Sequence, residues 1–102
     1  MKEVKYCRKR DGTIVAFEKN RIVTAIHKAF LEANEGNRFI AHKVTETVVE
    51  RVARIFLDDI PDVETIQDVV EEVLAEYRFL KTAKSYILYR DEHNRSRKAT
   101  LV

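Results

Sequence analysis

Four stretches of apolar residues spaced three and four positions apart limit most strongly what this chain of 102 residues can fold into. Such spacing puts the apolar side chains on one stripe of a helix, and that stripe has to be buried. The stretches begin at Lys19, at about residue 41, at Asp62 or Glu64, and at about residue 79. The residues expected to face inward are Ile22, Ile26, Ala29, Phe30, Ala33, Val44, Val48, Val52, Ile55, Phe56, Ile66, Val69, Val70, Val73, Leu74, Leu80, Ala83, Tyr86 and Ile87.

Turn and cap residues indicate where these four predicted helices begin and end. Asn20 has a side chain suited to the N-cap of the first helix, and Gly36 suits the left-handed conformation that ends it. The second helix should end near residue 57, before the helix-breaking residues 58–62. The third and fourth helices are separated only by RFLKT, so the sequence places their boundary to within several residues; the fourth should end near residue 95.

Two short segments ahead of the helices predict a β-hairpin. Residues 4–8 and 13–17 are rich in Val, Ile, Tyr and Phe, and the Asp-Gly pair between them is the strongest short-range hairpin signal. Cys7 is expected to be a small buried residue of the first strand. A hairpin followed by four helices belongs to the α+β class. Whether a third strand joins the hairpin stays open, with residues 58–63 as the candidate.

Composition and charge exclude several classes of protein. The length suits one domain, and a net charge of +2 is too small by itself to indicate a nucleic-acid partner. The chain has neither an apolar run near the roughly 20 residues that span a bilayer nor the apolar core of a signal peptide, so we expect a cytoplasmic protein. It has no catalytic constellation and no glycine-rich phosphate loop, so we expect no enzyme. One cysteine excludes an internal disulfide, and widely spaced histidines indicate no metal site; these residues are Cys7, His27, His42 and His93.

Cations gather at the predicted hairpin turn and at the start of the first helix. Lys9 and Arg10 adjoin the Asp-Gly pair, and Arg21 follows shortly after. Arginine forks, lysine charges and free N–H groups at a helix N-terminus are all suited to phosphate. On spacing alone, a solvated turn explains the same residues. The basic residues of the C-terminal segment likewise fit either a solvated helix end or a tether to a larger body.

The chain resembles the ATP-cone domain family in three segments. The first is KRDGTIVAFEKNRIVTAIHKAF, which has the KRDG turn, a strand ending in an aromatic residue, and Arg-Ile at the head of the first helix. The segments VETIQDVVEEVL and AKSYILYRDEHNRSR are similar to the third and the closing helix of the family. The match assigns residues 1–95 to an ATP-cone and leaves residues 96–102 as a basic tail or linker.

This resemblance implies a small β-sheet capping a four-helix bundle, and a regulatory function. ATP-cones usually lie at the N-terminus of ribonucleotide reductases, where ATP permits activity and dATP stops it, largely by changing how subunits associate. The implied ligand is ATP or dATP, for which Mg²⁺ is a candidate companion. The implied partners are the reductase catalytic body or its subunits and further copies of the chain. The opening and the tail are most similar to the anaerobic and cobalamin-dependent reductases.

The resemblance also implies roles for individual residues. Lys9 and Arg10 match the basic pair that holds the phosphates, and Arg21 matches a further cation on the phosphate side. Ile22 and Ile66 match apolar residues that wall the base.

Further positions are implied more loosely. Gln67 falls where some members place a polar residue near the nucleotide, and Lys84 and Arg90 match additional phosphate contacts. Val15 and Glu18 fall near positions where some members have polar ligands, and a valine side chain cannot hydrogen-bond a base or sugar. Two tyrosines of the closing helix fit either the core or base stacking, with the core preferred: Tyr86 and Tyr89.

Two other functions stay open at this point. A nucleotide-responsive transcriptional regulator of this family carries a zinc ribbon with four cysteines, so a chain with one cysteine is not the full repressor. Its near-neutral charge also argues against direct nucleic-acid binding. A plain helical interaction module predicts no affinity for nucleotide. The number of nucleotides bound, one or two, and the choice between ATP and dATP also stay open.

Overall fold

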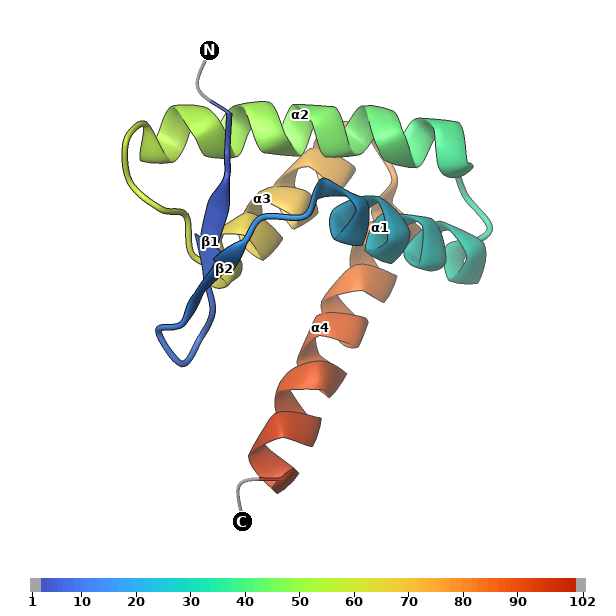
Figure 1. Ribbon diagram of the computed structural model, residues 1–102. Helices are drawn as coiled ribbons and strands as arrows, with labels where there is room; N and C mark the ends of the chain where they lie inside the picture. Colours follow the sequence, from blue (N-terminus) through green and yellow to red (C-terminus); the bar gives the residue numbers. More distant parts are fainter. Residues whose placement is uncertain (1–2, 101–102) are drawn as a thin grey trace.

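The structure is a computed structural model that describes residues 3–100, with side chains described for residues 3–93. A two-stranded hairpin precedes four helices (Figure 1), which confirms the α+β prediction. The elements in chain order are β1 (Tyr6–Arg8), β2 (Ile14–Ala16), α1 (Lys19–Ala33), α2 (Arg38–Phe56), α3 (Val63–Glu76) and α4 (Leu80–Thr100).

The hairpin is closed by the predicted Asp-Gly turn. β1 and β2 are antiparallel, with Cys7 opposite Val15. Gly12 has φ +90° and its N–H donates to the carbonyl of Lys9 at 2.9 Å, while the N–H of Lys9 donates to the carbonyl of Thr13 at 2.8 Å. The tight turn therefore presents Lys9 and its neighbours beyond the end of the sheet.

A third strand does not form in the part of the chain that the structure describes. The candidate segment 58–63 contributes only one parallel bridge, between Arg8 and Asp62. The N–H of Arg8 donates to the carbonyl of Pro61 at 2.8 Å. This contact ties the hairpin to the start of α3, where the chain enters a helix instead of continuing as a strand.

The four helices pack in a ring, in which each helix contacts two others. α1 and α3 each contact both α2 and α4, and α4 extends away from the other three (Figure 1). The apolar stripes predicted for α1 and α3 are largely buried, and Cys7 is buried as expected. The buried apolar residues are Cys7, Val23, Ile26, Ala29, Phe30, Ala41, Val44, Val48, Val52, Ile66, Val69, Val70, Val73, Leu74, Ala83 and Tyr86.

Three residues expected to face inward are instead exposed. Ile55, Leu80 and Ile87 have exposed fractions of 53%, 62% and 46%. α4 buries the face that carries Thr82, Ala83 and Tyr86, because this face meets α1 and α3. Leu80 and Ile87 lie on neighbouring faces that no other helix covers in the described part of the chain.

The helix ends differ from the expected positions by a few residues. The N-cap of α1 is Glu18 and not Asn20. α2 begins at Arg38, earlier than expected, because the side chain of Asn37 accepts a hydrogen bond from the N–H of Ile40. The left-handed C-cap of α1 is Asn34, although Gly36 also has positive φ. α4 remains helical to Thr100, beyond the predicted end near residue 95.

Candidate functional site

A cavity of about 500 Å³ lies between the hairpin, α1, α3 and α4, and we call it the hairpin cavity. Its volume is in the range of small-molecule sites in proteins. Its lining residues come from elements that are far apart in the sequence. The lining residues are Cys7, Lys9, Arg10, Val15, Ala16, Phe17, Glu18, Arg21, Ile22, Ala25, Val63, Ile66, Gln67, Tyr86, Tyr89, Arg90 and His93.

The cationic side of the hairpin cavity is formed by the turn and by the first turn of α1. Lys9 makes no ion pair within the described residues, whereas Arg10 pairs with Glu64 and donates a hydrogen bond to Oε1 of Gln67 at 3.2 Å. Nε of Arg21 pairs with Oε2 of Glu18 at 2.7 Å, and both side chains are exposed. Two of these three cations are therefore held by carboxylates that a stronger anion would have to displace.

The first turn of α1 begins next to the lining residue Glu18 and offers further hydrogen-bond donors, although the N–H of Arg21 already donates to the carbonyl of Glu18 at 3.1 Å. Glu18, the N-cap residue, makes no side-chain hydrogen bond to the first turn, and its carboxylate is turned to Arg21 instead. The first N–H groups of a helix have no partner within the helix, and they attract anions. By contrast, the first turn of α3 is capped by Asp62, whose side chain accepts from the N–H of Thr65 at 3.0 Å.

Arg90 is held by three carboxylates of α3. It donates to Asp68 at 2.8 Å, to Glu71 at 2.6 Å and to Glu64 at 2.6 Å. Burial opposes the charge of Arg90, but the hydrogen bonds to these three carboxylates outweigh burial and raise its pKa above the ordinary value. Arg90 thus lines the cavity as a cation whose Nη1 and Nη2 donors are already used.

The hairpin cavity also has an apolar part in its lining. Ile22 and Ala25 come from α1, Ile66 comes from α3, and the buried ring of Tyr86 comes from α4. Burial raises the pKa of the Tyr86 hydroxyl, so this phenol stays neutral at physiological pH. Burial likewise raises the pKa of the Cys7 thiol. Apolar side chains favour an apolar ligand group, and the cations at the turn favour a negatively charged one.

An aromatic pair on α4 borders the cavity, and only one of its two residues was considered from the sequence. The rings of Tyr89 and His93 lie 4.4 Å apart at 58°. Of the two tyrosines considered from the sequence, Tyr86 is buried in the core and Tyr89 is exposed at the cavity. His93 was missed, although it follows Tyr86 and Tyr89 at helical spacing, seven and four positions on, which places it on the same face.

The structure brings together seven of the eight residues named from the sequence. The eighth, Lys84, does not line the hairpin cavity, because it lies on the face of α4 turned away from Tyr86. The seven that do line it are Lys9, Arg10, Arg21, Ile22, Ile66, Gln67 and Arg90.

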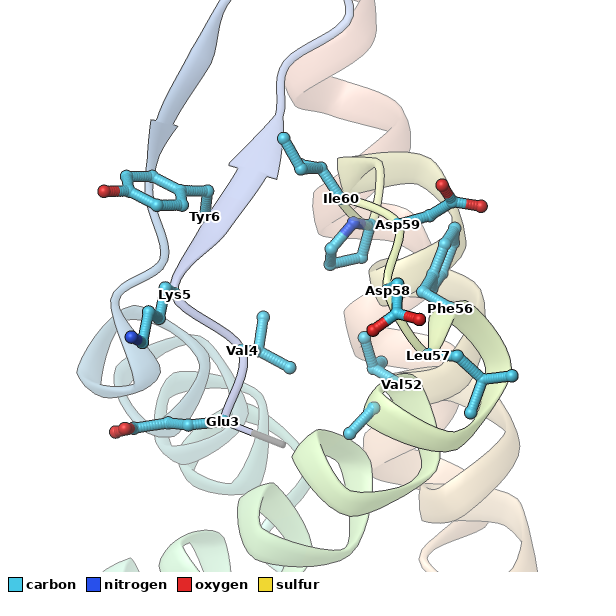
Figure 2. Close-up of a pocket in the computed structure, with 12 residues that line it drawn as sticks. Glu3, Val4, Lys5, Tyr6, Val52, Phe56, Leu57, Asp58, Asp59 and Ile60 are labelled. Carbon is cyan, nitrogen blue, oxygen red and sulfur yellow. The ribbon is translucent and has the colours of Figure 1, made fainter. Parts of the chain in front are cut away.

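A second, smaller cavity of about 160 Å³ lies beside the N-terminal segment (Figure 2). Figure 2 shows Val4 on one side of it, and Val52 and Asp58 on the other. Its charged lining residues are Glu3, Asp58 and Asp59 against the single cation Lys5. An excess of carboxylates disfavours a phosphate ligand, so the hairpin cavity is the better candidate site.

The described residues contain neither a membrane-spanning helix nor a cluster of metal-binding side chains. None of their helices combines the length and apolar character needed to cross a membrane. In the same residues, no group of three or more His, Cys, Asp or Glu side chains is arranged to hold a metal ion.

Comparisons with known proteins point to one family. Residues 5–95 match the family profile described as the ATP cone domain. A vitamin B12-dependent ribonucleoside-diphosphate reductase of Thermoplasma acidophilum is 47% identical over 89 residues, which cover 82% of this chain and 11% of that protein. An anaerobic ribonucleoside-triphosphate reductase of Haemophilus influenzae is 34% identical, with 87% of this chain and 12% of that protein covered. The chain therefore spans only about a tenth of the length of these relatives.

Proposed function

Because the chain belongs to the ATP cone domain family, we propose that it binds ATP or dATP in the hairpin cavity as an allosteric ligand. ATP cones are, in general, allosteric regulatory domains. The single observation that carries the proposal is a division in the lining of one cavity, between cations from the hairpin turn and α1 and apolar side chains from α1, α3 and α4. A nucleoside triphosphate has the same division, with charge at one end and a flat base at the other.

The phosphates are proposed to lie against Lys9, Arg10 and Arg21. Lys9 has no competing ion pair among the described residues, and the open N-terminus of α1 supplies N–H donors nearby. Arg90 is left out of this set because its three carboxylate partners already satisfy it. Lys84 is left out because it lies outside the cavity.

The base is proposed to lie between Ile22 and Ile66, with Tyr86 beneath it. Apolar side chains and ring faces are suited to an aromatic base. Gln67 also lines the cavity, and its amide oxygen already accepts a hydrogen bond from Arg10. Val15 lines the cavity without a polar side-chain atom, so discrimination between ATP and dATP has to rest on other groups.

The domain is further proposed to be a non-catalytic part of a ribonucleotide reductase, or a partner of one, and to change subunit association when nucleotide binds. The relatives are named as reductases, and the chain matches only a small share of their length. The alternatives are a regulator of transcription and a plain interaction module. Either would share the fold but would not be associated with a reductase.

Calorimetric titration with ATP and with dATP tests the proposal directly. The wild-type domain should bind saturably, and the double variant Lys9→Ala/Arg10→Ala should lose binding because two of the three proposed phosphate contacts are removed. Repeating the titration with and without Mg²⁺ shows whether the cation accompanies the triphosphate. Light scattering on the same samples shows whether the mass changes with nucleotide.

A matched control removes the same charge elsewhere. The variant Lys43→Ala/Arg54→Ala changes two exposed cations of α2, a helix that does not line the hairpin cavity, and should bind like the wild type. Equal affinity of all three proteins would show that the turn does not hold the phosphates. No binding of either nucleotide to the wild type would refute the nucleotide-sensing function.

A further inference from the structure

Glu64 joins two arginines that both line the hairpin cavity. It lies in the first turn of α3, where its Oε1 pairs with Nε of Arg10 at the hairpin turn. Its Oε2 accepts a hydrogen bond from Nη2 of Arg90 on α4 at 2.6 Å. One carboxylate thus connects the turn, α3 and α4 at the edge of the site.

The two arginines depend on Glu64 to different degrees. Arg90 has Asp68 and Glu71 as further charged partners, both within 2.8 Å. The other contact of Arg10 in the described part of the chain is one hydrogen bond to the neutral amide of Gln67. Glu64 is therefore the carboxylate that neutralises Arg10, whereas Arg90 would remain paired without it.

We propose that Glu64 is an internal competitor for the phosphate site. A triphosphate binds there by replacing the Glu64 carboxylate as the partner of Arg10. The inference rests on the proposed function, which assigns Arg10 to the phosphates. The side chain of Glu64 is 47% exposed, so its ion pair with Arg10 is partly screened by water and is easily exchanged. A triphosphate carries several charges and offers forked oxygens to a guanidinium, so it competes better than a ligand with one phosphate.

This exchange of the partner of Arg10 also changes the charge balance next to α4. When Arg10 moves to the ligand, Glu64 retains Arg90 as its partner, and the carboxylates Glu64, Asp68 and Glu71 then face one arginine instead of two. The balance of charge along the contact between α3 and α4 becomes more negative. Occupancy of the cavity is thereby sensed by the helix that extends furthest from the rest of the domain (Figure 1).

The probe for this inference is inorganic tripolyphosphate, which tests the phosphate side without the base. Glu64→Gln removes the charge at nearly constant shape and should tighten tripolyphosphate binding by about 1.5-fold to fivefold, the range expected for losing a half-exposed ion pair. Glu64→Asp keeps the charge and should bind like the wild type. Glu72→Gln is the matched control on the same helix, since its carboxylate faces Arg51 of α2 at 3.9 Å, and it should change nothing.

A second measurement keeps the test independent of whether Glu64→Gln folds well. In the wild type, the NMR signal of the Arg10 Nε–H group should shift on titration with tripolyphosphate, because this donor exchanges a carboxylate for a phosphate. An unmoved Arg10 signal, unchanged or weaker binding by Glu64→Gln, or no binding to either protein would each overturn the competitor role.

The same proteins titrated with ATP separate this inference from the proposed function. Tripolyphosphate binding that tightens in Glu64→Gln, together with no ATP binding to any variant, would retain the competitor role and refute the nucleotide site. Equal ATP and equal tripolyphosphate affinities in the wild type and Glu64→Gln would retain the nucleotide site and refute the competitor role.

Discussion

Gly36 shows how a single residue allows the loop between α1 and α2 to pack against the core. It has φ +58°, and a Cβ atom at this position would lie 2.7 Å from three ring atoms of Phe30. That ring is buried and meets Phe79 edge-on, with ring centroids 5.0 Å apart. Glycine is therefore required here both by its backbone conformation and by the close approach of the ring.

Gly36→Ala should destabilise the domain more than Gly12→Ala. Both glycines have positive φ, but a Cβ at Gly12 would meet nothing within 4 Å. The Gly12 variant should lose roughly 1–2 kcal/mol from backbone strain, and the Gly36 variant roughly 1–3 kcal/mol more from overpacking against Phe30. Urea unfolding of both proteins measures the difference. Equal losses of unfolding free energy would show that the Phe30 ring moves aside without destabilising the fold.

Asp62 should contribute to stability as the N-cap of α3, and its contribution should depend on pH. Asp62→Ala should cost about 1 kcal/mol at neutral pH, whereas Asp62→Asn should cost little because asparagine also caps. Burial opposes the charge of Asp62, but hydrogen bonds from the N–H and hydroxyl of Thr65 prevail and lower its pKa.

The sign of the pH dependence follows from that lowered pKa. A carboxyl group whose folded pKa is depressed stabilises the fold fully above its unfolded pKa of about 3.9, and this contribution is lost as the pH falls through the folded value. The stability difference between wild type and Asp62→Asn should therefore change only below about pH 5. A difference that changes between pH 6 and pH 8 would contradict the assignment.

For single residues, the sequence predicts a structural role best when the interacting partner lies close along the chain. Asp62 was one of two candidates for the start of α3, and its partner Thr65 is three residues away. The cap of α1 was misplaced because Asn20 has the better capping side chain, whereas the chain enters the helix at Glu18. The exposure of Ile55 could not be foreseen, because helical spacing does not say how wide the covered face is.

At the scale of the element, α4 is capped by a residue from a distant loop. Oε1 of Glu35, between α1 and α2, accepts hydrogen bonds from the N–H and the hydroxyl of Thr82, each at 2.8 Å. Thr82 is fully buried, so these donors have no access to water. The contact holds the first turn of α4 against the loop that follows α1.

Glu35→Ala should destabilise the domain by roughly 1–3 kcal/mol, because it leaves buried donors of Thr82 without an acceptor. Glu35→Gln replaces the carboxylate oxygen by an amide oxygen that can still accept these hydrogen bonds, so it should cost clearly less. Thermal unfolding of the two variants provides the comparison. A glutamine variant as unstable as the alanine variant would indicate that the charge at the start of α4 matters more than the hydrogen bonds.

The sequence predicted the order and type of the elements better than their contacts. Periodicity and the Asp-Gly pair identified the hairpin and four helices because both signals are local. The third-strand question, the exposed side chains of Leu80 and Ile87, and the role of Glu35 depend on which elements meet, and no local pattern carries that information.

At the scale of the whole molecule, the hairpin cavity exists only when four elements are in place. Binding to the folded state alone should therefore stabilise the entire domain. At free ATP near 100 times the dissociation constant, the free energy of unfolding should rise by about 2.7 kcal/mol, which for a domain of this size raises the melting temperature by roughly 10–20 °C. Denaturation of Lys9→Ala/Arg10→Ala should be insensitive to ATP, and a shift equal to that of the wild type would contradict the site.

The residues that form the site were predictable only where the family resemblance named them. Lys9, Arg10 and Arg21 line the same cavity, which spacing alone did not establish. The contacts of Arg90 with the carboxylates of α3 were not predictable, since they join residues 19 to 26 positions apart on different helices. Its assignment as a phosphate contact is the part of the site that the geometry supports least.

The most direct test of the central claim is to map where ATP binds, using backbone amide chemical shifts of the domain during titration. If ATP binds in the hairpin cavity, the largest shifts should occur in the turn at residues 9–13, at the start of α1, near Ile66 and Gln67, and at residues 86–93 of α4. Largest shifts at residues 3–6 and 57–61, around the cavity of Figure 2, or the absence of any shift at saturating ATP, would contradict it.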